Sequence, residues 1–355
     1  MAHSTTGPVP RIHLEKTGEC LDRDEWTSMA ACPGPLHLAA SCFDGTISIW
    51  DVETAERLQS VGQSVQARFT SILGSQLGFK TGPLSRLPIA TARDLRDRLY
   101  PQTITVLQGE EVVVCGWNNG LSMWDPRTSE HKFAPDFREE VLAVAASPDG
   151  KRCAAGTQSG DLYLWDIHAW REEMRLLSRR KSQQGSFADG VWLLDRNYLA
   201  TTGAWTALEI WDLQSEEEVP IVVRFPDGVR YSNTYLHTKV AHTNRPGVVA
   251  VARMCAAAQF RVPGGALLSL WQHPSSLITD LCPLPNPHGQ SLMILGLSPD
   301  ARFLVLDLET GQVIEEQQTD AVVYAVAASS DGSHVVTRSS EKKGATIWKV
   351  SWLPI

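Results

Sequence analysis

A short pattern returns along this chain and limits its possible folds more than any other feature. Three copies read SCFDGTISIWD at residues 41–51, GWNNGLSMWD at 116–125 and GTQSGDLYLWD at 156–166. In each copy a polar turn containing glycine separates two runs of alternating side chains, and the second run ends in Trp-Asp. Successive residues of a strand face opposite sides, and glycine tolerates the positive φ of a tight turn. Each copy therefore predicts a β-hairpin.

Further strands lie on both sides of these hairpins. An apolar run and a polar turn precede some of them, as in VLAVAASPDGK at 141–151 and VVYAVAASSDG at 322–332. Another short run follows Trp-Asp, as at Glu56–Val61. The repeating unit is therefore expected to contain four strands.

Each unit has one marker residue, which is the Trp of Trp-Asp or, where that Trp is missing, the residue at the same place in the repeat. Seven such markers can be counted. The markers are Trp50, Trp124, Trp165, Trp211, Phe260, Leu306 and Trp348. From the second marker on they lie 41 to 49 residues apart, but 74 residues separate the first two. This excess of about 30 residues over an ordinary repeat predicts an insertion at Gly62–Gln102. With Phe260 as the fifth marker, Trp271 is expected on the outer strand of its unit.

This arrangement resembles the WD-repeat (WD40) family of β-propellers over nearly the whole chain. The resemblance implies an all-β, seven-bladed propeller with four antiparallel strands per blade, in a single domain over residues 1–355. The last unit is one strand short, and Val9–Glu15 is expected to supply it, so that the N-terminal strand closes the ring. The chain lacks the Gly-His dipeptide that usually precedes Trp-Asp in the family, which marks it as a divergent member.

Charge and composition narrow the class of protein. The net charge of −8 disfavours direct binding of nucleic acid or anionic lipid. No secretory signal and no run of about 18 apolar residues is present, so we expect neither secretion nor membrane insertion. The seven cysteines are dispersed and include no C-x-x-C pair, which favours a reducing compartment, the cytoplasm or the nucleus.

No motif of enzyme chemistry is present. The sequence has no nucleophile elbow, P-loop, zinc-protease or dinucleotide-binding motif. We therefore expect no catalytic residues, no cofactor and no metal. The resemblance implies a monomeric scaffold that binds other proteins inside a larger complex. A propeller enzyme whose site is assembled from dispersed loop residues is the more distant alternative.

Two of the tryptophans outside the marker positions are expected at turns inside their units. Trp117 lies in WNNG at 117–120 and Trp205 in GAWT at 203–206, where small or polar residues are usual. Exposed aromatic side chains are enriched at interface hot spots. Each is therefore a candidate for partner binding, or else packs against a neighbouring loop.

The insertion is a second candidate for partner binding. It carries six basic and two acidic residues, a charge of +4 that leaves −12 on the rest of the chain. Residues 90–100 are expected to form a short amphipathic helix that presents Arg93, Arg96 and Arg98. Arg179, Arg180 and Lys181 are expected in a basic loop on the same face, which would suit an acidic peptide or protein. The alternatives are a tolerated surface loop and, for 179–182, a short nuclear-import or phosphorylation signal.

One further motif points to a different function. Trp124-Asp125-Pro126-Arg127 resembles the Trp-Asp-x-Arg box of propellers that act as substrate receptors of cullin-RING ubiquitin ligases. The resemblance implies that Arg127 docks an adaptor on the face opposite the insertion. A basic residue two places after Trp-Asp also arises by chance among seven repeats.

Overall fold

The computed structural model describes most of the chain, in two compact units. The described residues are 10–21, 26–32, 36–42, 45–61, 101–107, 112–117, 120–134, 137, 139–167, 170, 174–181, 190–195, 197–202, 208–215, 219–226, 238–287, 289–339 and 344–353. One unit is Leu21–Arg224, and the other combines Met1–Cys20 with Phe225–Ile355.

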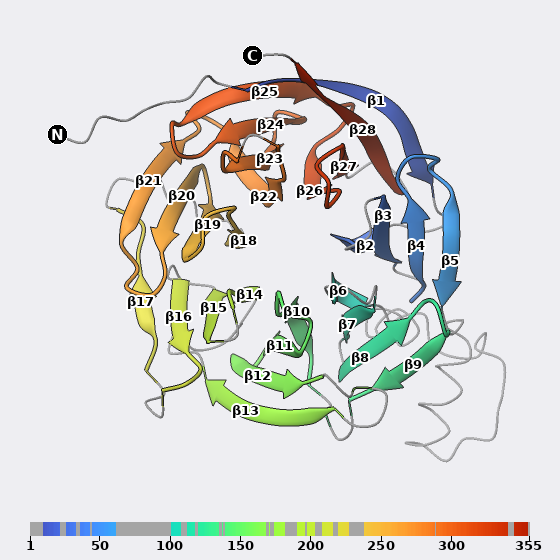
Figure 1. Ribbon diagram of the computed structural model, residues 1–355, viewed down its shortest axis with the longest axis vertical. Helices are drawn as coiled ribbons and strands as arrows, with labels where there is room; N and C mark the ends of the chain where they lie inside the picture. Colours follow the sequence, from blue (N-terminus) through green and yellow to red (C-terminus); the bar gives the residue numbers. More distant parts are fainter. Residues whose placement is uncertain are drawn as a thin grey trace, which may run out of the picture. The chain divides into compact units, whose positions relative to one another are not determined.

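The unit Leu21–Arg224 contains four sheets, each of four antiparallel strands in chain order from inside to outside (Figure 1). The first two are β2 (Trp26–Ala31), β3 (His37–Cys42), β4 (Ile47–Asp51) and β5 (Arg57–Val61), then β6 (Pro101–Val106), β7 (Val113–Trp117), β8 (Gly120–Asp125) and β9 (Glu130–Phe133). The next two are β10 (Val141–Ala146), β11 (Arg152–Thr157), β12 (Asp161–Asp166) and β13 (Arg175–Lys181), then β14 (Gly190–Leu193), β15 (Tyr198–Thr202), β16 (Leu208–Asp212) and β17 (Ile221–Val223).

The other unit contains three sheets of the same kind. They are β18 (Lys239–His242), β19 (Val248–Arg253), β20 (Ala256–Arg261) and β21 (Leu267–Gln272); β22 (Leu277–Leu284), β23 (Leu292–Ser298), β24 (Arg302–Asp307) and β25 (Gln312–Gln318); and β26 (Val323–Ala328), β27 (His334–Ser339), β28 (Gly344–Leu353) and β1 (Arg11–Leu21). In the last sheet the strand order is β1-β28-β27-β26.

These seven sheets are the blades of a seven-bladed β-propeller, and no helix occurs among the described residues. The predicted fold class is confirmed. Every predicted marker lies on the third strand of its blade and is buried, including Phe260 on β20 and Leu306 on β24. Trp271 lies on the outer strand β21, as expected.

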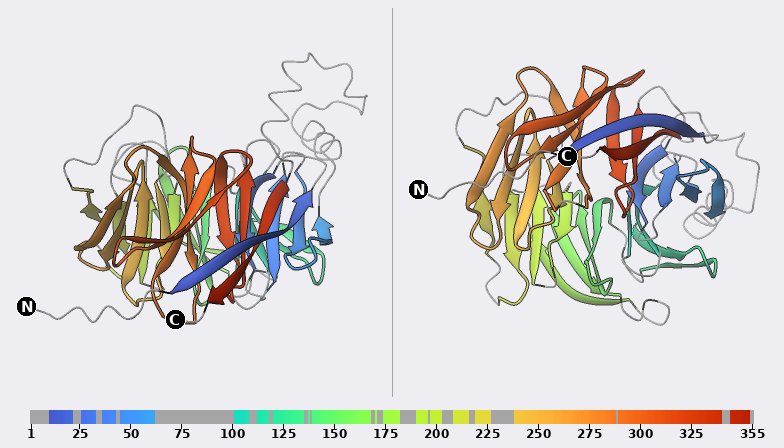
Figure 2. Two further views of the ribbon diagram at one scale, coloured as in Figure 1. Left: turned by 90° about the horizontal axis from the view of Figure 1, so that it is seen from above. Right: turned by 45° about the horizontal axis from the view of Figure 1, so that its top comes forward.

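The N-terminal strand β1 forms the outer edge of the last blade. Both views in Figure 2 show it alongside β28. Ile12 and Leu14 of β1 are buried in one cluster with Trp348 and Val350 of β28 and with Phe303. The closure of a ring by this strand stays a prediction, as does the single domain over residues 1–355.

The Asp of Trp-Asp has a local function in several blades. The Asp51 carboxylate accepts hydrogen bonds from the backbone N–H groups of Glu53 and Thr54, at 2.8 and 2.9 Å. Asp212 accepts in the same way from the N–H of Gln214 at 2.8 Å. An Asp side chain that bonds the backbone two residues later forms a local turn. The dipeptide thus ends the third strand and starts the turn to the outer strand.

A second turn motif joins the first two strands of two blades. Ser147 donates a hydrogen bond from its hydroxyl to Asp149 at 2.6 Å, and Ser329 does the same to Asp331 at 2.6 Å. The bond from Ser147 is the largest influence that holds the pKa of Asp149 below its ordinary value. Gly332 follows Asp331 with φ of 68°, and a Cβ there would lie 1.9 Å from a backbone oxygen of Pro285. Only glycine fits this turn.

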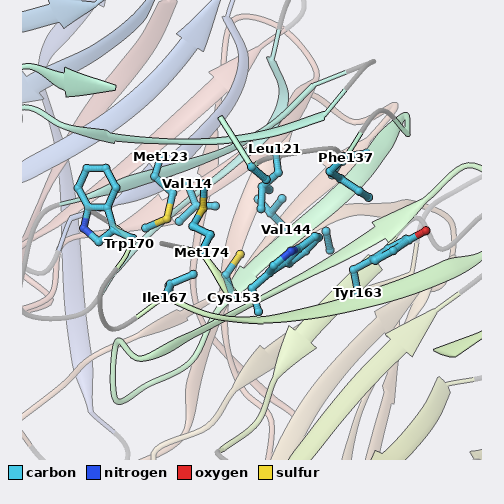
Figure 3. Close-up of a cluster of buried hydrophobic side chains, with 14 of the residues drawn as sticks. Val114, Leu121, Met123, Phe137, Val144, Cys153, Tyr163, Ile167, Trp170 and Met174 are labelled. Carbon is cyan, nitrogen blue, oxygen red and sulfur yellow. The ribbon is translucent and has the colours of Figure 1, made fainter. Parts of the chain in front are cut away.

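Apolar side chains of neighbouring blades form the cores. Figure 3 shows one such cluster, in which β7 and β8 contribute Val114, Leu121 and Met123. Strands β10 and β11 contribute Val144 and Cys153 to the same cluster. Burial of this kind stabilises by about 25 cal/mol per Å² of apolar surface. This core joins the sheets of the second and third blades, so the strands of these two blades are held in fixed positions.

Candidate functional site

A group of polar side chains lies at one end of the third blade, where β12 begins. We call it the Arg179 cluster, and it consists of Glu139, Ser159, Asp161, Tyr163 and Arg179. Strand pairing explains how it forms, because Arg179 on β13 lies directly opposite Tyr163 on β12. Ser159 belongs to the β11–β12 turn, and Glu139 lies two residues before β10.

Arg179 is held by two carboxylates and one ring. Its Nη2 lies 2.9 Å from Asp161 Oδ2 and 3.7 Å from Glu139 Oε1. Its guanidinium carbon lies 5.3 Å from the centre of the Tyr163 ring. The hydrogen bond to Asp161 is the largest influence that raises the pKa of Arg179. The Arg179 side chain is 57% exposed, yet its charge is already balanced within the cluster.

Tyr163 anchors the cluster to the core. Its hydroxyl donates a hydrogen bond to Glu139, and its ring stacks on Trp165 with centroids 5.6 Å apart. Phe137 packs edge-on against both rings. Burial, and then the bond to Glu139, raise the pKa of Tyr163. The phenol therefore stays protonated at neutral pH and acts as a fixed hydrogen-bond donor.

The end of the insertion reaches the same place. Gln102, the last residue of the predicted insertion, donates from Nε2 to Glu140 Oε1 at 3.0 Å. Glu140 directly follows Glu139 of the Arg179 cluster. The second and third blades are thus joined at this end by a side-chain bond.

The charge of these described residues differs from the basic face expected from the sequence. Glu139, Glu140 and Asp161 carry three negative charges, against the single positive charge of Arg179. The sequence pattern places Arg179–Lys181 in a basic loop, which is wrong, because β13 extends to Lys181 and pairs with β12. Strand pairing sets Arg179 against acidic neighbours that are distant in sequence.

The comparisons with known proteins agree with this architecture. The family model described as WD domain, G-beta repeat, matches residues 22–51 and 129–166. Both matches end at the Asp of Trp-Asp on the third strand of a blade. The chain belongs to the WD40-repeat family. WD40 propellers bind other proteins and are generally non-catalytic scaffolds.

Two curated relatives share parts of this WD40 chain. Protein LST8 homolog of Drosophila melanogaster is 26% identical over 80 residues, which is 22% of this chain and 24% of the relative. Telomerase protein component 1 of Rattus norvegicus is 43% identical over 124 residues, which is 30% of this chain and 4% of the relative. The chain thus spans less than a quarter of the length of either relative.

Arg180 lies away from the Arg179 cluster and is buried. Its guanidinium donates to the backbone oxygens of Asp212 and Ser215, at 3.1 and 3.3 Å. It also lies 5.8 Å from the Trp211 ring centre. Asp212 is the last residue of β16, so Arg180 contacts the C-terminal end of that strand. Arg180 therefore joins two WD40 blades and is not exposed on the expected face.

Trp117 is a core residue of its WD40 blade. The prediction of an exposed ring is wrong, because Trp117 is 0% exposed and packs with Trp124 between the first two blades. Its Nε1 donates to Ser122 Oγ at 2.7 Å, and His131 Nε2 lies 3.0 Å from the same oxygen. The ring packs as the alternative expected, but against strands of two blades and not against a neighbouring loop. Trp117 is the last residue of β7 and pairs with Gly120, so it belongs to the strand and not to the turn in which the sequence placed it.

Of the remaining candidate residues, the structure describes the side chain of Arg127 alone. Trp205, Arg93, Arg96 and Arg98, the insertion up to residue 100 and the Lys181 side chain lie outside the described residues. Arg127 is described, and its side chain is 53% exposed and lies 3.4 Å from Asp125 in its own turn. It follows Asp125, the last residue of β8, so it lies at the end of that strand away from Gly120.

The described residues contain no group of three or more His, Cys, Asp or Glu side chains placed to hold a metal ion. The same residues include no helix with the length and apolar character needed to cross a bilayer.

Proposed function

We propose that this WD40 chain is a non-catalytic scaffold that holds other proteins together in a multiprotein complex. The WD40 fold supports this function, since its propellers bind proteins. The rat relative is a protein component of telomerase, which is consistent with a component of an assembly.

The proposed contact surface is the end of the second and third blades that carries the Arg179 cluster. The bond from Gln102 to Glu140 carries this proposal, because it joins the end of the insertion to a group of charged side chains, among them the exposed Arg179. Binding residues often lie on loops that a rigid scaffold positions.

The insertion supplies the basic part of this surface in our proposal. The described residues around Arg179 are acidic on balance, whereas Arg93, Arg96 and Arg98 belong to a segment with a charge of +4. An acidic partner would therefore be recognised by the insertion, and charge complementarity would orient it.

The test is affinity purification followed by mass spectrometry with the full chain. We expect the combined variant R93E, R96E and R98E to lose a set of proteins that the wild type retains. Arg127→Glu is the matched control, because it also reverses an exposed charge but lies outside the insertion, just after the end of β8. This variant should keep the proteins that the wild type retains. A triple variant with an unchanged set of partners would remove the proposed surface.

The same experiment tests the ubiquitin-ligase alternative. Arg127 is exposed and its guanidinium is oriented by Asp125, which favours its availability to a docking protein. If Arg127→Ala loses a cullin adaptor and the triple variant does not, the chain acts as a substrate receptor instead.

We also propose that the chain resides in a reducing compartment, the cytoplasm or the nucleus. All seven cysteines are free, and six of them are buried, which supports this location. Imaging of a fluorescent fusion would test it, and accumulation in the secretory pathway would contradict it.

A further inference from the structure

The outer strand of the fifth blade, β21, differs in chemistry from most other blade edges. It is the last strand in the order β18-β19-β20-β21, so its outer edge pairs with no strand that the structure describes. Its sequence is LLSLWQ, without a charged residue. Leu267, Leu268 and Leu270 are exposed, at 42%, 38% and 38%.

Charged side chains occur on the other long outer strands that the structure describes. They include Arg57 on β5, Glu130 and Lys132 on β9, Arg175 and Arg179 on β13, Glu315 and Glu316 on β25, and Arg11, Glu15 and Lys16 on β1. Such charges prevent edge strands from pairing with other chains. The outer strand β17 is also uncharged, but it has only three residues. Strand β21 is therefore the longest described edge without this protection.

We propose that β21 pairs with β21 of a second copy of this chain, antiparallel and about a two-fold axis at Leu270. Strand β21 is regular from Ser269 to Gln272, because the only irregularity in its pairing with β20 falls at Leu268. A pair centred on Leu270 uses this regular part. It sets the two Leu270 side chains next to each other and Ser269 opposite Trp271 of the second copy.

The composition of β21 favours a second copy as the occupant. In the proposed pair the two Leu270 side chains lie next to each other, Leu268 of each copy lies nearest Gln272 of the other, and no like charges meet. A two-fold contact needs a surface that is complementary to itself, and an uncharged apolar strand fulfils this. The contact is limited to one strand of six residues, so we expect a weak, concentration-dependent dimer instead of the monomer expected from the sequence.

The first test is sedimentation velocity over a wide range of protein concentration. The wild type should show a dimer fraction that rises with concentration, and Leu270→Lys should weaken association at least about tenfold, because it sets two like charges at the axis. Val313→Lys is the matched control, since Val313 is 39% exposed on the already charged outer strand β25. A wild type that stays monomeric, or an L270K variant that associates equally well, would overturn the proposal.

The second test probes the position of the axis. Opposite residues in an antiparallel pair have Cα atoms about 4.5–5.5 Å apart, within the range of a disulfide. Leu270→Cys should therefore form a disulfide between two copies on mild oxidation. Gln272→Cys is exposed on the same strand, but two such residues would lie about 13 Å apart and should not react. Equal cross-linking of both variants, or none of L270C, would contradict the proposed pair.

Discussion

Trp117 and Ser122 form a buried hydrogen bond across the β7–β8 hairpin, in which the indole N–H donates to the hydroxyl oxygen at 2.7 Å. His131 on β9 lies 3.0 Å from the same oxygen, so three strands of the second blade meet at Ser122. Trp50, Trp211 and Trp348 also donate to a serine or threonine hydroxyl of their own blade. In these four blades the bond holds a large buried ring against its own sheet.

Substitution of Ser122 by alanine should destabilise the protein by about 1–3 kcal/mol, because the buried indole loses this acceptor. Urea unfolding followed by tryptophan fluorescence would measure the change in the free energy of unfolding. Ser60→Ala, at an exposed serine on β5, is the matched control and should change it by less than about 0.5 kcal/mol. Equal effects of the two substitutions would show that the bond to Ser122 contributes little.

The fold could be predicted from the sequence because its signals are local. Alternation with period two, glycine at tight turns and the Trp-Asp turn all act within about ten residues. Spacing alone then placed Phe260 and Leu306 on the third strands of blades that lack the Trp marker.

The candidate site could be predicted only in part. Arg179 was identified by its charge, but its partners Glu139 and Asp161 are set by the pairing of β12 with β13 and the packing of the third blade. Trp117 was singled out as unusual, yet its burial depends on Ser122 and on packing between the first two blades. Contacts between residues distant in sequence leave no local pattern.

The native protein should react slowly with a thiol reagent such as DTNB at mildly alkaline pH. Six cysteines are buried, and Cys282 is intermediate in exposure. Loss of contact with water still raises the pKa of the Cys282 thiol to about 12. The thiolate is the reactive form, so less than one equivalent should react before unfolding and all seven after it. Rapid reaction of two or more thiols in the native protein would contradict the described burial.

Removal of the N-terminal strand should lower the melting temperature. Deletion of residues 1–16 removes Ile12 and Leu14, which are buried against Trp348 and Val350. Loss of either side chain from a core typically costs about 2–5 kcal/mol. Differential scanning calorimetry would measure the change, and Glu15→Ala, at an exposed position on the same strand, should leave the melting temperature nearly unchanged. Unchanged melting after the deletion would contradict closure of the propeller by β1.

Tyr163 should make stability sensitive to alkaline pH. Its pKa is raised in the folded protein, mainly by burial, whereas in the unfolded chain it is about 10. Above pH 10 the unfolded chain therefore loses this proton before the folded protein does, which favours unfolding. The stabilisation from Tyr163 is complete below pH 10 and decreases as the pH rises toward the raised pKa.

Tyr163→Phe isolates this effect, because the two proteins share every other tyrosine. At about pH 8 the wild type should be more stable by about 1 kcal/mol, the usual contribution of one hydrogen bond, here the bond to Glu139. Urea unfolding at about pH 11 should show a smaller difference, since the unfolded wild type then gains stability by ionising at residue 163. A difference that stays constant or grows with pH would mean that the Tyr163 hydroxyl is not held protonated in the Arg179 cluster.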